Sequence, residues 1–211
     1  MNIHTIKQRF LTDLKETAVS EVISKWLIDR TPHIFYGKRQ LYLLWKEKLS
    51  ERLRIDSHAM CIIGSAGLGF SLNPNKQFKQ FDYLSDVDIA IISNHFFELS
   101  WHTLRNIGSG LYLLDHKQKA SIRDHVQRLI YWGTIATDRI ITIFPFGKLW
   151  IKSLSDMARI EPTEDRKINI RLYRDYESLR SYHAYNLTKL RQELFFPTGE
   201  KLNESILEHN P

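Results

Sequence analysis

The fold of this chain is decided by two short apolar runs, HAMCIIGS at residues 58–65 and SDVDIAIIS at residues 85–93. Both runs are rich in apolar and β-branched residues and too short for an independent helix, so each predicts a buried strand. The first run ends in Gly64 and Ser65, and the second begins with Asp86 and Asp88. We therefore expect the functional groups of the protein where these two strands meet.

Asp86 and Asp88 are two positions apart at the start of the second predicted strand. Side chains alternate along a strand, so these two carboxylates point to the same side. Two carboxylates directed at one point repel each other unless a cation lies between them. A hard divalent ion with oxygen ligands suits this position, so the pair predicts a Mg²⁺ or Mn²⁺ site.

Gly64 and Ser65 provide the complementary half of such a site. A small residue after a strand lets the backbone approach a bulky anion, and the Ser65 hydroxyl and the following amides offer hydrogen-bond donors. A phosphate contact beside a carboxylate metal site is typical of metal-assisted phosphoryl or nucleotidyl transfer.

This arrangement resembles the DNA polymerase beta-like nucleotidyltransferase superfamily, which has an apolar residue, Gly and Gly or Ser, then a spacer and an Asp-apolar-Asp-apolar strand. The resemblance covers residues 58–93 by motif and 58–146 as a fold. It implies that Asp86 and Asp88 bind Mg²⁺ or Mn²⁺, and that Gly64 and Ser65 contact the triphosphate. The short stand-alone bacterial members of the family imply a role in a toxin–antitoxin pair or in phage defence.

Two features depart from the family pattern. The spacer, residues 66–85, is longer than usual and contains the polar stretch 71–81, which predicts a loop over the nucleotide or an insert that reads the substrate. The family also has a third carboxylate on a later strand of the sheet. The best later strand is RIITIF at residues 139–144, which contains no acid, so Asp138 at its edge is our candidate.

Helical periodicity surrounds the two strands and predicts an α+β (α/β) fold, with a small mixed sheet flanked by helices and a C-terminal helical part. The expected helices cover residues 5–29, 38–54, 96 onward, 117–131, 147–157 and 170–195. We expect a nucleotidyltransferase domain at residues 1–160, and a helical extension with a mobile tail at 161–211.

Lys167, Arg171 and Arg174 are spaced to share one face of the last predicted helix. An ordinary solvated face explains this pattern, and so does contact with phosphate or nucleic acid. In the second interpretation, Arg171 and Arg174 bind the tail of the nucleotide.

The composition limits the class of protein. The chain of 211 residues has a formal charge of +6, which permits a nucleic-acid partner but also suits an ATP pocket. Cys61 is the single cysteine, so no internal disulfide forms, and a cytoplasmic location is expected. No run of about 18 apolar residues predicts a membrane span, and no zinc-ligand spacing is found.

The leading hypothesis is therefore a metal-dependent nucleotidyltransferase that moves a nucleoside monophosphate group from a nucleoside triphosphate to a hydroxyl acceptor. A protein, a tRNA or a small molecule remains open as the acceptor, and a protein partner is also compatible. The alternatives are a catalytically impaired nucleotide-binding regulatory protein and an RNA-binding module that uses the basic C-terminal helix. The regulatory alternative follows from the missing acid in the strand predicted at 139–144.

Overall fold

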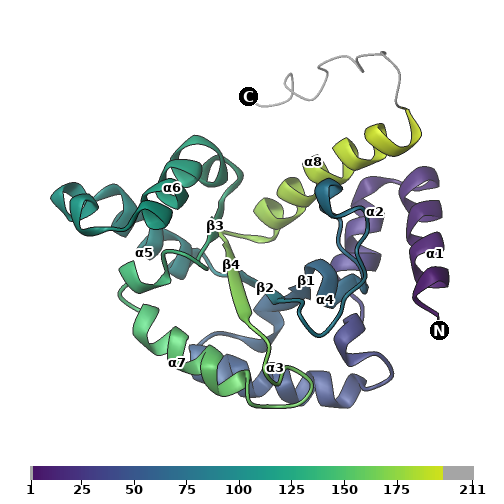
Figure 1. Ribbon diagram of the computed structural model, residues 1–211, viewed down its shortest axis with the longest axis horizontal. Coiled ribbons are helices and arrows are strands. Elements are labelled where there is room, and N and C mark those ends of the chain that lie inside the picture. Colours follow the sequence, from purple (N-terminus) through teal and green to yellow (C-terminus); the bar gives the residue numbers. More distant parts are fainter. Residues whose placement is uncertain (1, 197–211) are drawn as a thin grey trace.

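A four-stranded mixed sheet forms the centre of the computed structural model, which describes residues 2–196 (Figure 1). The strand order is β1-β2-β4-β3, with β2 and β4 parallel and the two outer pairs antiparallel. The strands are β1 (Met60–Ile63), β2 (Val87–Ile92), β3 (Thr134–Ala136) and β4 (Ile168–Tyr173). The α+β class expected from the sequence is confirmed.

Helices cover both faces of the sheet (Figure 1). The α-helices are α1 (Ile3–Glu16), α2 (Val19–Ile23), α3 (Arg39–Leu53), α4 (Gly64–Leu68), α5 (Asn94–Arg105), α6 (His116–Asp124), α7 (Gly147–Met157) and α8 (Tyr176–Phe195). Short π-helices are η1 (Ser24–Ile28) and η6 (His125–Leu129), and short 3₁₀-helices are η2 (His33–Phe35), η3 (Ser57–Ala59), η4 (Pro74–Lys76), η5 (Gly108–Leu113), η7 (Ile130–Trp132) and η8 (Ile141–Ile143).

The two faces of the sheet bury two different sets of side chains. One face packs Ile62, Ile89 and Ile170 against helices α3, α5 and α7. On the other face, Cys61 and Ala90 pack against α1, α2 and α8. Because side chains alternate along each strand, the second face also receives the polar residues of β2 and β4.

The prediction of a strand at residues 139–144 is wrong. The third strand in sequence, β3, comes earlier, and the chain then turns, with the Ile140 amide donating to the Thr137 carbonyl at 3.0 Å. The 3₁₀-helix η8 follows in place of a strand. Ile140 and Phe144 are nevertheless buried, although the backbone of this run is not extended into a strand.

The helix predicted at 170–195 begins too early. Residues 168–173 form β4, and α8 starts only at Tyr176 after the N-cap Asp175. Lys167, Arg171 and Arg174 therefore do not share a helix face, and the RNA-binding alternative stays a prediction. The single helix predicted at 5–29 is also interrupted, because α1 ends at an extended Thr17.

Helices predicted at 38–54, from 96 and at 147–157 are confirmed as α3, α5 and α7. The mobile tail expected up to residue 211 lies almost entirely outside the described residues, and the boundary at residue 160 stays a prediction. Across residues 2–196, no helix is both long and apolar enough to cross a lipid bilayer.

Candidate active site

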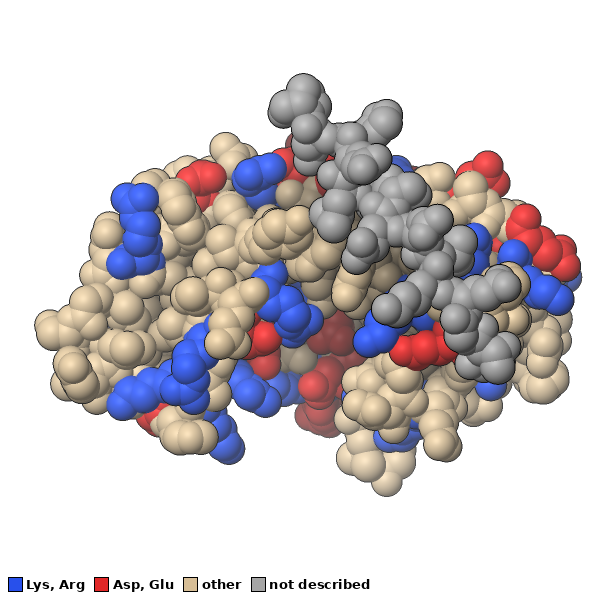
Figure 2. All heavy atoms as spheres, turned by 90° about the horizontal axis from the view of Figure 1, so that it is seen from above, with Lys and Arg blue, Asp and Glu red and all other residues tan. Residues whose placement is uncertain are grey.

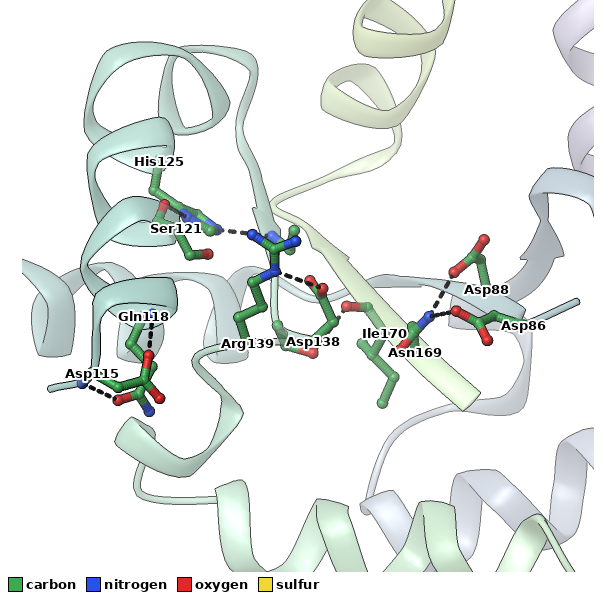
Figure 3. A network of polar contacts seen from close by, with 12 residues as sticks. Asp86, Asp88, Asp115, Gln118, Ser121, His125, Asp138, Arg139, Asn169 and Ile170 are labelled. Carbon is green, nitrogen blue, oxygen red and sulfur yellow. Dashed lines mark hydrogen bonds and ion pairs between the residues drawn. The ribbon is translucent and has the colours of Figure 1, made fainter. Parts of the chain in front are cut away.

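Asp86 and Asp88 converge on one side chain of the neighbouring parallel strand. Asp88 lies opposite Asn169 in the β2–β4 register. The Asn169 amide nitrogen Nδ2 is 3.2 Å from an oxygen of Asp86 and 3.2 Å from an oxygen of Asp88 (Figure 3). The two carboxylates thus point to one side, as their spacing predicts.

The loop before β2 is fixed by Arg166. Its Nη1 donates to the carbonyls of Asp82 and Ser85 at 2.6 and 3.1 Å, and its guanidinium lies 4.6 Å from the centre of the Phe81 ring. These contacts hold the residue immediately before Asp86, so they orient the entry to β2.

Gly64 lies against Asp88 at the end of β1. Ile63 pairs with Asp88 in the antiparallel register, and Gly64 follows with a φ of +65°. A Cβ at this position would be 3.0 Å from Oδ2 of Asp88, so glycine keeps space beside that oxygen and also tolerates the backbone conformation. Ser65 is the next residue, within the short helix α4.

Asp138 approaches from the opposite side of Asn169 (Figure 3). It follows Thr137, whose amide and hydroxyl both donate to the Ile170 carbonyl, at 3.1 and 2.9 Å. This anchor holds the turn after β3 against β4. The Asp138 carboxylate is 3.9 Å from the Arg139 guanidinium, so it is a weakly paired, partly exposed acid.

His125 supports the same turn from η6. Its Nε2 accepts from the Ala136 amide at 3.0 Å, and its Nδ1 lies 2.6 Å from the Ser121 carbonyl (Figure 3). This pair of contacts needs a neutral ring with the proton on Nδ1. Burial lowers the pKa of His125, which favours the same neutral form.

A cavity of about 540 Å³ brings most of these groups together. The candidate residues that line it are Gly64, Ser65, Asp88, Asp138, Asn169 and Arg171. Part of the long spacer also lines it, at residues 71–74 and at Lys76. Figure 2 shows acidic side chains in a hollow between the parts of the molecule that carry α6, at left, and α1, at right, with Lys and Arg beside them.

Arg171 and Arg174 occupy different environments. Arg171 lies on β4, where its Nη1 donates to the Tyr182 hydroxyl at 2.9 Å beside the cavity. Arg174 lies in the turn before α8, is paired with Asp175 at 3.0 Å, and is not among the described residues that line the cavity. Of these two arginines, Arg171 alone lines the described part of the cavity.

The charge of Asp88 is only partly compensated by its surroundings. Burial raises the pKa of Asp88, and the nearby negative charges of Asp86 and Asp138 raise it further. The Asn169 amide and the Arg171 charge act in the opposite direction. Asp88 is thus a partly buried carboxylate whose ionised form lacks full compensation.

Asn169 is the residue of the site that sequence reasoning missed. The resemblance implies a third carboxylate on a later strand, and β4 is the later strand that pairs with β2. The alternation of apolar and polar residues at 168–172 was the available signal, since it has the period of a half-buried strand.

Comparison with family models, characterised proteins and solved structures finds no match to this chain. Within residues 2–196, no three His, Cys, Asp or Glu side chains are grouped closely enough to hold a metal ion by themselves. A functional assignment therefore depends on the residues of the cavity and on their chemistry.

Proposed function

We propose that this protein transfers a nucleotidyl group from a nucleoside triphosphate to a hydroxyl acceptor. The observation that carries the proposal is the convergence of Asp86 and Asp88 on Asn169, beside a cavity lined by Gly64 and Ser65. Its volume, about 540 Å³, lies within the usual range for small-molecule sites.

The donor atoms at this position suit Mg²⁺ or Mn²⁺. Asp86 and Asp88 supply hard carboxylate oxygens, and Gly64 leaves space beside one of them. Mg²⁺ is commonly held by one or two carboxylates together with substrate phosphates and water, so the lack of a third acidic ligand is compatible with it. When bound, the ion would neutralise phosphate charge and lower the pKa of a coordinated hydroxyl.

The transfer itself is a substitution at the α-phosphorus. The acceptor oxygen forms a bond to that phosphorus, the bond to the β-phosphate oxygen breaks, and pyrophosphate leaves. The acceptor proton passes to a base, and Asp138 is the carboxylate available for this on the other side of Asn169. Arg171 offers a positive charge to the triphosphate from β4.

A second function is favoured by Asn169. An amide stands opposite Asp88, where a further carboxylate would complete a three-acid site. A protein that binds a nucleotide in this cavity and signals its presence, without turnover, would need the cavity but not the third acid. We therefore keep a nucleotide-binding regulatory protein as the alternative proposal.

The test is pyrophosphate release from each of the four ribonucleoside triphosphates with Mg²⁺ or Mn²⁺, alone and with total tRNA or cell lysate. We expect release by the wild type and a loss of at least about 100-fold in Asp88→Asn. Asp124→Asn is the matched control, because Asp124, at the end of α6, pairs with Arg128 of η6 and does not line the described part of the cavity.

If no pyrophosphate is released, a measurement of nucleotide binding distinguishes the two proposals. A silent protein whose melting temperature rises with a nucleoside triphosphate supports the regulatory alternative. In that case Asn169→Asp, which adds the missing acid, should give measurable pyrophosphate release. If the protein neither releases pyrophosphate nor gains thermal stability from any nucleotide, both proposals are wrong.

A further inference from the structure

A second cavity, of about 610 Å³, lies between α1 and η1. Among the described residues, its lining shares no member with the cavity at Asp88. The lining residues are Thr5, Ile6, Gln8, Arg9, Thr12, Asp13, Lys25, Trp26, Arg30 and Tyr36. The proposed transferase chemistry uses none of these residues.

Arg30 is the unusual residue of this cavity. Its Nη1 is buried and has no hydrogen-bond partner, and within residues 2–196 no ion pair includes it. Its guanidinium lies 5.0 Å from the centre of the Trp26 ring. Burial lowers the pKa of Arg30, which reflects the cost of holding this cation away from water.

The one carboxylate among the described lining residues is already paired within the protein. Asp13 is 2.6 Å from the Lys25 ammonium and accepts from the Trp26 indole nitrogen Nε1 at 2.7 Å. The charge of Asp13 is therefore compensated by Lys25, and Asp13 forms no ion pair with Arg30. With Arg9 also in the lining, the described residues of this cavity include three cationic side chains and one neutralised acid.

We propose that this cavity binds a small phosphorylated molecule whose phosphate pairs with the Arg30 guanidinium. The planar fork of a guanidinium donates two parallel hydrogen bonds to phosphate oxygens, and the Arg30 side chain lines the cavity. Thr5, Gln8 and Thr12 offer further polar groups, and the volume suits a ligand of nucleotide size.

The experiment uses the Trp26 indole N–H as a local probe, because it lies in the lining and is bonded to Asp13. Full-length protein carrying ¹⁵N-tryptophan is titrated with inorganic phosphate and, separately, with AMP, and Trp26→Phe assigns the resonance. We expect both anions to shift it, in the wild type and in Asp88→Asn alike. Arg30→Gln should weaken binding at least about tenfold.

Lys15→Gln is the matched control, since it removes a positive charge from the exposed side of α1 outside the lining. It should leave the affinity unchanged. Persistence of the shift in Asp88→Asn makes this result independent of the proposed transferase site. A Trp26 resonance that neither anion moves, or that moves equally in Arg30→Gln, would overturn the proposal.

Loss of an unpaired buried cation should not destabilise the fold, so Arg30→Gln is expected to melt no lower than the wild type. If it does not fold, Arg30→Lys replaces it. Lysine keeps the charge but lacks the planar fork, so weaker phosphate binding is expected, and undiminished binding would contradict the role of the guanidinium.

Discussion

His183 illustrates how one partly buried group makes stability depend on pH. Its Nε2 is 3.1 Å from the hydroxyl of the fully buried Tyr173, at the wall of the Asp88 cavity. Burial lowers the pKa of His183 to about 3, and the Arg171 charge acts in the same direction. The folded protein therefore holds this ring neutral at pH values where the unfolded chain protonates it.

The consequence is a loss of stability in mild acid. A lowered folded-state pKa means that the unfolded chain binds more protons, so the free energy of unfolding falls as the pH drops below the ordinary histidine value. The decline attributable to His183 is at most about 1.4 kcal/mol per pH unit below about pH 6.5. Urea denaturation between about pH 7 and about pH 5 measures it.

His183→Gln should flatten this dependence, while the exposed His4→Gln should leave it unchanged. Some dependence remains in both variants, because burial also lowers the pKa of His125. Identical pH profiles for the wild type and His183→Gln would show that His183 is protonated equally in the folded and unfolded states.

At the scale of elements, sequence patterns located the strands that carry Asp86 and Asp88 but not their partner. β1 and β2 were predicted because each is a continuous apolar run, buried on both faces. The pattern of residues 168–173 instead predicts the start of a helix, because Leu172 fits the spacing of Tyr176 and Leu179 by coincidence. Local periodicity could not reveal that Asn169 pairs with a residue 81 positions earlier.

The incorrect prediction of a strand at residues 139–144 has a different cause. The run at 139–144 is rich in β-branched residues, and these residues favour strands when only the local sequence is considered. The edge of β4 is instead occupied by β3, three residues long, and the chain turns away after it. Tertiary pairing, rather than local preference, selects the strand here.

A contact between α8 and α1 provides a test at the scale of elements. Arg191 of α8 donates from Nε to the Leu14 carbonyl at 2.5 Å and from Nη2 to the Thr17 carbonyl, at the C-terminal end of α1. Arg191→Met keeps the apolar stem but leaves two carbonyls without these donors. We expect a loss of roughly 1–3 kcal/mol in the free energy of unfolding, measured with urea.

Lys189→Met provides the control for the charge change on α8. Lys189 is exposed and lies 4.0 Å from Glu193, so its removal should alter stability by less than about 0.5 kcal/mol. Equal losses in the two variants would mean that the Arg191 contacts do not fasten α8 to α1.

At the scale of the whole molecule, the sheet separates two apolar cores. Helices α3, α5 and α7 enclose one core, and α1, α2 and α8 enclose the other. Cys61 faces the second core from the edge strand β1, and its side chain is buried. Access to this thiol therefore requires the second layer of helices to open.

Thiol labelling measures that opening. Burial raises the pKa of Cys61 to about 12, so the native thiol is both shielded and protonated. We expect a disulfide reagent to label the native protein about a thousandfold or more slowly than the denatured chain. Cys61→Ser, which lacks the single thiol, is the blank, and rapid labelling of the native protein would contradict this packing.

The pairing of β2 with β4 also has a consequence during synthesis. The ribosome releases Asp86 and Asp88 long before Asn169, and β4 must insert between β2 and β3 before these carboxylates meet their amide partner. A nascent chain that ends before residue 168 carries both acids but lacks one wall of the cavity. The candidate site is therefore completed late in translation, which keeps unfinished chains from assembling it.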